Sequence, residues 1–152
     1  MFTKGSIYFI SNYQYEDGGT PTNKLLLVVC IDDENSLLLR ALPTSQQKVP
    51  DQMVNHGCTN NTIFSFFTFL KDRVIGIDKN GDDFSFDKNT FVFFRDNVEV
   101  IPYQTILSYY PDDASLLGEL SEVEYKRFLK CIIGSKMLRK KHKDFLTSTL
   151  SE

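Results

Sequence analysis

The stretch that decides the fold is residues 23–45, which read NKLLLVVCIDDENSLLLRALPTS. Its two apolar runs, residues 25–31 and 36–42, flank the acidic turn 32–35 and predict a pair of adjacent strands. The first run is apolar at every position, so we expect it at the centre of a sheet with both faces buried. Pro43 ends the second run and leaves the hydroxyls of Thr44 and Ser45 at the strand tip. Such a tip is a rigid place for a functional site.

Length and composition indicate one globular domain over residues 1–152, with 13 Phe and 7 Tyr available for its core. The three cysteines, Cys30, Cys58 and Cys131, are widely spaced and odd in number. This pattern favours buried free thiols in a reducing cytosol. The sequence has no signal peptide and no apolar run of about 18 residues. We therefore expect a cytoplasmic protein that does not bind a membrane.

The formal charge of −3 is unevenly distributed. Residues from Ser121 onward hold eight Lys and Arg against four acids, a balance of +4 that leaves −7 for residues 1–120. An acidic body argues against binding nucleic acid over a broad surface, which needs clustered cations. The basic run 136–143 is typical of a solvated helix end, and binding of nucleic acid or an acidic partner is the alternative.

Short apolar runs separated by turn residues predict a small mainly β barrel or sandwich over about residues 1–112. The polar stretches 12–23 and 46–61 have no apolar period and indicate loops. Asn80-Gly81 predicts a hairpin turn, because this dipeptide accepts positive φ. Outside the central pair, the predicted strands cover residues 7–11, 63–70, 74–77, 84–86, 91–94, 98–101 and 104–109.

A helical signal occurs only in the last part of the chain, about residues 119–152. Ser121 and Glu124 match a capping box, in which we expect each side chain to bond to a backbone amide near the other residue. Apolar residues recur behind it at helical spacing and predict one amphipathic helix. Gly134-Ser135 either ends this helix or lets it bend into a second basic turn that reaches about Phe145.

Few residues indicate a catalytic or metal-binding site by themselves. No phosphate-binding glycine loop, HExxH motif or CxxC pair occurs, so no metal site or cofactor is expected. His56 and Cys58 are the one place where an imidazole and a thiol lie close in sequence, and a pair of ordinary loop residues is the favoured interpretation. Thr44 and Ser45 alone would be turn formers, and Lys24 alone would be an exposed charge at the start of a strand.

The order of these elements resembles the PemK/MazF family of toxin ribonucleases. The similar segments are Lys4-Gly5-Ser6-Ile7-Tyr8, the run from Asn23 to Val29, Ala41-Leu42-Pro43-Thr44-Ser45, Lys48-Val49-Pro50 and the step from Leu117 to Glu122. They extend over about two-thirds of the chain, and their order carries most of the likeness. Three features depart from the family: Lys24 replaces an arginine, Ser6 replaces an acid, and residues 56–83 resemble an insertion.

The resemblance implies a small SH3-like PemK/MazF-type barrel with a C-terminal helix, and a toxin-like endoribonuclease. Such enzymes cut single-stranded RNA through the ribose 2′-hydroxyl without a metal. Carried over, Thr44 is the phosphate-stabilising hydroxyl with Ser45 beside it, Lys24 is the basic partner, and Arg40 and Lys48 bind RNA. Lysine offers a point charge where arginine would fork onto two phosphate oxygens.

The resemblance also implies a homodimer and a cognate antitoxin-like protein as partners. Likeness of fold does not by itself carry activity. The alternative is therefore a catalytically inactive SH3-like barrel that binds a protein, with the phenylalanine-rich segment 56–83 or the basic tail as its interface.

Overall fold

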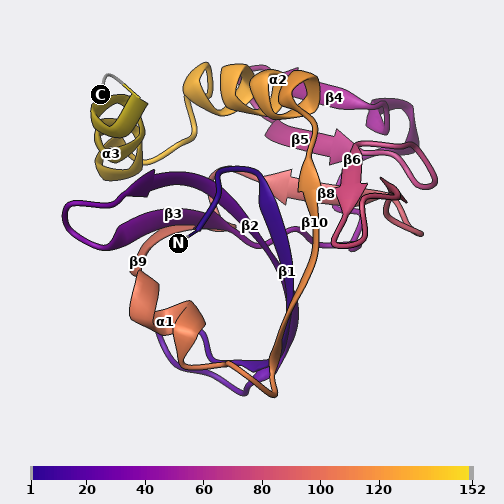
Figure 1. Cartoon of the computed structure of the whole chain (residues 1–152). Coiled ribbons are helices and arrows are strands. Elements are labelled where there is room, and N and C mark those ends of the chain that lie inside the picture. The colour runs from indigo at the N-terminus through magenta and orange to yellow at the C-terminus, as the bar shows by residue number, and fades with distance from the viewer. Residues whose placement is uncertain (1, 151–152) are drawn as a thin grey trace.

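The computed structural model describes residues 2–150 and is mainly β, with two antiparallel sheets and helices in its C-terminal part (Figure 1). The predicted class, mainly β with a C-terminal helix, is confirmed. The elements in chain order are β1 (Ser6–Tyr13), β2 (Thr22–Asp32), β3 (Leu37–Ala41), the 3-10 helix η1 (Asp51–Met53), β4 (Gly57–Asn60), β5 (Ser65–Phe69), β6 (Gly76–Asp78), β7 (Asp83–Phe84), β8 (Thr90–Phe93), β9 (Val98–Pro102), α1 (Tyr103–Leu107), β10 (Ala114–Leu120), α2 (Glu122–Ile133) and α3 (Lys140–Leu150).

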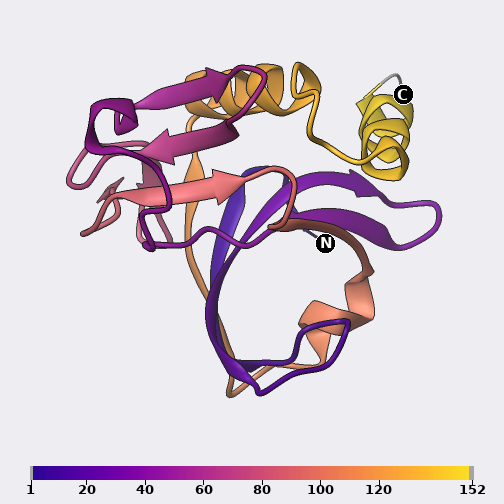
Figure 2. The same ribbon diagram turned by 180° about the vertical axis from the view of Figure 1, so that it is seen from behind.

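Seven strands form the larger sheet in the order β7-β6-β10-β1-β2-β3-β9, and β4-β5-β8 form the smaller one. The larger sheet curls around α1, and α2 covers the smaller sheet (Figures 1 and 2). The segment 56–83 supplies strands to both sheets: β4 and β5 to the smaller one and β6 to the larger one. Helix α3 packs on β2, β3 and β9. No helix within residues 2–150 is long and apolar enough to cross a membrane.

Strand β2 is buried on both faces, as its uninterrupted apolar run predicts. It lies between β1 and β3, and residues from Leu26 to Cys30 are at most 1% exposed. Leu27 and Val29 pack into a core shared with β5 and α2, while Leu26 and Val28 pack on the opposite side with α1. A register shift between Val28 and Cys30 turns Cys30 to the same core as Val29. The neighbouring strands β1 and β3 also contribute residues to both cores, so the two cores lie on opposite faces of the larger sheet.

Three segments differ from the sequence-based prediction. Residues 104–109, predicted as a strand, belong largely to α1, because Pro102 opens a helical turn that buries Tyr103 and Ile106 on one side. The stretch 46–61, predicted as a loop, contains η1 and the strand β4. Strand β10 was not predicted as a strand, since alternating apolar residues are weak between Ala114 and Leu120.

Helix α2 begins as predicted but lacks half of its capping box. The Ser121 hydroxyl accepts a hydrogen bond of 3.2 Å from the Glu124 amide, whereas the Glu124 carboxylate turns to His56 instead of the cap. The helix ends at Ile133 before the cap residue Gly134, and α3 is a separate helix. Of the two alternatives at Gly134, the ending of the helix is therefore confirmed.

The prediction of three free thiols is wrong for two of them. Cys58 in β4 and Cys131 in α2 form a disulfide, and only Cys30 is free and buried among residues 2–150. The two bonded cysteines are 73 residues apart, so only the packing of α2 on β4 brings their Cα atoms to 5.5 Å. Disulfides are rare in the cytosol. The expectation of a cytoplasmic protein therefore loses one of its two grounds, the free thiols.

Truncation of Phe128 should strongly destabilise the fold. Its fully buried ring contacts the rings of Phe67, Phe69 and Phe94 at centroid distances of 5.3, 6.2 and 5.8 Å. We expect Phe128→Ala to lower the free energy of unfolding by about 3–5 kcal/mol, measured by urea denaturation followed by circular dichroism. Val123→Ala, at a 61% exposed position of the same helix, should change it by less than about 0.5 kcal/mol. Equal effects of the two substitutions would contradict this description of the core.

Candidate functional site

Two adjoining cavities lie where β2 begins and where the chain leaves β3. Their volumes are about 360 and 460 Å³, and Lys24, Thr44 and Gln46 line both of them. We call the two together the Lys24–Thr44 groove. Ser45 lines the second cavity, while Arg40 and Lys48 line the first. The structure therefore brings all five predicted site residues to one groove.

The register of the central hairpin explains why Lys24 and Thr44 lie together. Leu27 pairs with Ala41, and Val28 pairs with Arg40. The observed pairing stops there, but the same register extended by three residues would set position 24 opposite position 44, and both residues line the same two cavities. A local hairpin thus brings the two residues to one groove, although they are twenty positions apart.

The backbone of Thr44 is held by the smaller sheet. Its N–H donates to the Phe91 carbonyl at 2.9 Å, and its carbonyl accepts from the Phe91 N–H at 2.8 Å. The Thr44 hydroxyl oxygen accepts a bond of 3.2 Å from the Gln46 N–H, which is the turn-forming contact expected of an ordinary threonine. Because an oxygen acceptor keeps its own O–H, this hydroxyl can still donate into the groove.

Lys24 is half-buried, and its Nζ lies 5.3 Å from the centroid of the Tyr15 ring. This cation–π contact orients the amine without neutralising it. Lys48 makes the same kind of contact with the Phe93 ring, at 5.8 Å. Neither lysine forms an ion pair within residues 2–150, so both amines remain available to a ligand in the groove.

Arg40 is tied into the wall of the groove. Its buried guanidinium donates to the Tyr13 hydroxyl at 3.3 Å and to the Asn97 carbonyl at 2.9 Å, and it forms an ion pair with Glu16. The Tyr13 hydroxyl also bonds to Glu16. Burial raises the pKa of Tyr13, which keeps this hydroxyl protonated and able to donate to the carboxylate. The contacts give Arg40 a structural role, and its binding to RNA stays a prediction.

Several groove residues were not predicted from the sequence. Arg95 follows β8, and Arg139 comes from the segment between α2 and α3. Within residues 2–150, the charged groups of Lys24, Lys48, Arg95 and Arg139 form no ion pair within 4.0 Å. Arg139 belongs to the basic run that was assigned to a solvated helix end. No pattern in the sequence indicates that Arg95 lies beside it.

Glu99 connects the groove to α3. Its carboxylate lies 2.9 Å from Nε2 of the buried His142 and 3.7 Å from Nζ of Lys141. Burial, the largest single influence, acts to raise the pKa of Glu99. The hydrogen bonds from His142 and the Val100 amide and the charges of His142 and Lys141 together outweigh it, so the pKa is lowered.

The pair His56 and Cys58 is structural. Nδ1 of His56 accepts a bond of 3.2 Å from the Leu70 N–H, so Nε2 carries the proton that it shares with the Glu124 carboxylate. Cys58 is held in the disulfide and is not a free nucleophile. Among the residues from 2 to 150, no group of three or more His, Cys, Asp or Glu side chains could hold a metal ion.

Comparison with protein-family models, curated proteins and solved structures finds no match to this chain. The resemblance to the PemK/MazF family therefore rests on the short segments quoted above, and membership of that family stays a prediction. The geometry of the groove is independent of that resemblance, because it follows from hairpin register and packing alone.

Replacement of Arg40 should weaken the fold. Arg40→Gln leaves Glu16 and Tyr13 without their cationic partner, and we expect a loss of about 2 kcal/mol in the free energy of unfolding. Arg95→Gln removes the same charge from an exposed side chain and should cost less than about 0.5 kcal/mol. Urea denaturation measures both. A cost for Arg40→Gln as small as that of the control would mean that Arg40 does not hold the groove wall.

Glu99 should make stability depend on pH in the acid range. Its pKa is lower in the folded than in the unfolded chain, so its contribution is present above the ordinary carboxyl pKa of 4.5 and is lost as the pH falls through the folded value. We expect the free energy of unfolding of Glu99→Gln to fall less steeply below pH 4.5 than that of the parent protein. Glu34→Gln, in the exposed β2–β3 turn, is the control and should retain the parental slope. Indistinguishable slopes for all three proteins would contradict the role of Glu99.

Proposed function

We propose that this protein is a metal-independent endoribonuclease that cuts single-stranded RNA in the Lys24–Thr44 groove. The observation that carries the proposal is that a lysine amine with no ion pair in residues 2–150 and a backbone-anchored hydroxyl line the same two cavities. Both groups suit a phosphodiester, since the amine offsets its charge and the hydroxyl donates to one of its oxygens.

The electrostatics of the groove support a phosphate ligand. Lys48, Arg95 and Arg139 add three cations to Lys24 around the first cavity. Four carboxylates line it too: Glu16 pairs with Arg40 and Glu99 with His142 and Lys141, which leaves Asp17 and Asp96. The lining charges that form no ion pair within residues 2–150 are thus four positive and two negative. The chain as a whole carries −3, so attraction for RNA is local to this groove rather than spread over the surface. The half-buried ring of Tyr15 beside Lys24 offers a face on which a base can stack.

The proposed reaction is attack of a ribose 2′-oxygen on the adjacent phosphorus. The new O2′–P bond forms as the P–O5′ bond breaks, which leaves a 2′,3′-cyclic phosphate and a 5′-hydroxyl. The Thr44 hydroxyl donates to a non-bridging oxygen, and the Lys24 ammonium stabilises the developing charge and protonates O5′. Asp17 and Asp96 line the groove without an ion-pair partner within residues 2–150, so we assign the proton acceptor to one of them.

The partners and location that accompany this proposal follow from the same resemblance. We propose a homodimer and a cognate antitoxin-like protein that covers the groove. A cytoplasmic location belongs to this proposal as well, and the disulfide counts against it.

A protein-binding module without catalysis is the second candidate. Val74, Ile77 and Val123 are exposed by 54%, 52% and 61%. Their segments adjoin, because the Ser121 N–H donates to the Ile75 carbonyl at 2.9 Å and Glu119 pairs with Ile77. Clustered exposed apolar side chains are a feature of protein interfaces.

RNA cleavage in the presence of a chelator tests the first candidate. We expect the purified protein to cut a long single-stranded RNA in EDTA into discrete fragments with cyclic-phosphate ends. Lys24→Ala and Thr44→Ala should each lower kcat/KM by about 10²-fold to 10³-fold, as expected when a donor to the transition state is removed. Thr44→Ser should retain most of the activity, because it keeps the hydroxyl. Lys24→Arg keeps the charge but cannot give up a proton to O5′, so its activity should lie between those of Lys24→Ala and the parent.

Lys79→Ala is the matched control, since it removes the same charge from an exposed position in the β6–β7 turn. It should cut like the parent. Cleavage by Lys24→Ala and Thr44→Ala at the parental rate would refute the site. Intact RNA would refute the activity and leave the protein-binding module as the better proposal.

A further inference from the structure

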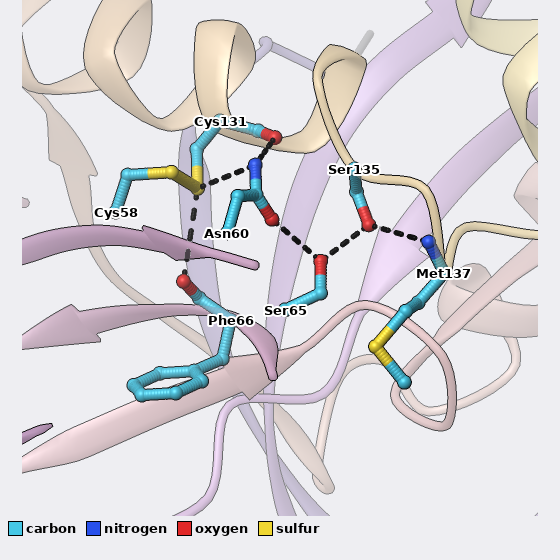
Figure 3. The surroundings of a disulfide bond; sticks show 7 residues. All are labelled: Cys58, Asn60, Ser65, Phe66, Cys131, Ser135 and Met137. Carbon is cyan, nitrogen blue, oxygen red and sulfur yellow. Dashed lines mark hydrogen bonds between the residues drawn. A yellow bond between two sulfur atoms is a disulfide. The ribbon is translucent and has the colours of Figure 1, made fainter. Parts of the chain in front are cut away.

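The Cys58–Cys131 disulfide lies at the surface between β4 and α2 (Figure 3). Cys58 is exposed, whereas Cys131 is only 2% exposed. Figure 3 shows the Cys131 sulfur directed toward two polar groups below α2. The Asn60 Nδ2 lies 3.8 Å from this sulfur, and the Phe66 carbonyl oxygen lies 3.7 Å from it. The two sulfurs thus differ in access and in surroundings.

A cavity of about 420 Å³ opens onto this bond. Both cysteines line it together with Gly57, Phe67, Arg127 and Lys130. Gly57 adopts φ +108° and has no atom within 4 Å of the place where a Cβ would stand, so the approach past it is open. Arg127 and Lys130 are exposed cations, and the Arg127 guanidinium is only loosely paired, at 3.9 Å from Glu124. An accessible sulfur therefore sits beside positive charge.

We propose that this cavity is a thiol–disulfide exchange site, at which an anionic low-molecular-weight thiol forms a mixed disulfide with Cys58. The inference is independent of RNA cleavage. Anionic groups of the thiol pair with Arg127 and Lys130, and the same cations favour its thiolate form, which is the nucleophile. A cationic thiol of similar size is repelled.

The exchange is balanced in atoms and electrons. The thiolate attacks Sγ of Cys58, a new S–S bond forms, and the Cys58–Cys131 bond breaks with its electron pair on Sγ of Cys131. The Asn60 amide is placed to donate to that thiolate. After proton uptake from solvent, the Cys131 thiol can donate to the Phe66 carbonyl. Access sets the direction of the exchange: the attacking thiolate can reach the exposed Cys58 sulfur, which carries the adduct, and the buried Cys131 sulfur leaves.

The adduct should leave the fold intact, because α2 keeps other links to the small sheet. Asn60 Nδ2 donates to the Cys131 carbonyl at 2.9 Å, Glu124 remains bonded to His56, and the Ser65 and Ser135 hydroxyls bond to each other. Ser135 also accepts from the Met137 amide at 3.2 Å and so anchors the segment after the helix. Exchange therefore breaks the one disulfide between α2 and β4, while the hydrogen bonds still hold α2 on the smaller sheet.

Reaction of the native full-length protein with two small thiols tests the site. The probes are 2-mercaptoethanesulfonate, which is anionic, and cysteamine, which is cationic, with rates expressed per thiolate. Alkylation stops the reaction, and mass spectrometry with peptide mapping locates the adduct. We expect the adduct on Cys58 and a rate at least about fivefold higher for the sulfonate, as two nearby cations predict at moderate ionic strength.

A double variant and a matched control test whether Arg127 and Lys130 cause the preference for the anionic thiol. Arg127→Gln with Lys130→Gln should abolish the preference, whereas Lys126→Gln with Lys136→Gln removes the same charge from exposed positions outside the cavity and should keep it. The proposal is overturned if the purified protein has three free thiols, or if the disulfide reacts only after unfolding. It is also overturned if the adduct forms on Cys131, or if the double variant retains the preference.

Discussion

The burial of β2 on both of its faces is the constraint on which the rest of this structure depends. Together with its neighbours β1 and β3, this strand separates two apolar cores, so the elements on each side must cover it: β5 and α2 on one side and α1 on the other. The aromatic residues are distributed accordingly, with Phe67, Phe69 and Phe128 filling one core and Tyr13 and Tyr103 lying in the other. A strand of this kind must lie in the interior of a sheet, since an edge strand leaves part of its backbone unpaired.

The groove is a consequence of how this strand is paired. Because β3 follows β2 in a hairpin, the start of one strand and the exit from the other meet at the same edge, and Lys24 and Thr44 share two cavities there. Anchoring by Phe91 then holds Thr44 against the smaller sheet. Arg95 and Arg139 complete the groove, and they come from the turn after β8 and from the segment before α3. Its charge is therefore a property of the assembled molecule.

The C-terminal helices join the remote parts of the chain. Helix α2 is held to the small sheet by the disulfide and by the contact of Glu124 with His56, and α3 is held to β9 by His142 and Glu99. Glu124 and His142 are nearly inaccessible side chains whose charges or dipoles require partners. These polar contacts explain why Glu124, which the sequence predicts as part of a cap, and His142, which it predicts in a solvated tail, lie in interfaces instead.

The amino-acid sequence by itself determined the features that arise between near neighbours. The apolar run of β2, the turn after it, the Asn80-Gly81 hairpin and the cap at Ser121 each depend on a few consecutive residues, and all are present. The meeting of Lys24 and Thr44 also follows from hairpin register. Only the tertiary structure decided the helix at Tyr103, the strand β10, the Cys58–Cys131 bond and the positions of Arg95 and Arg139. Each of these is set by contacts between segments far apart in the chain, whose approach depends on how both cores pack around β2.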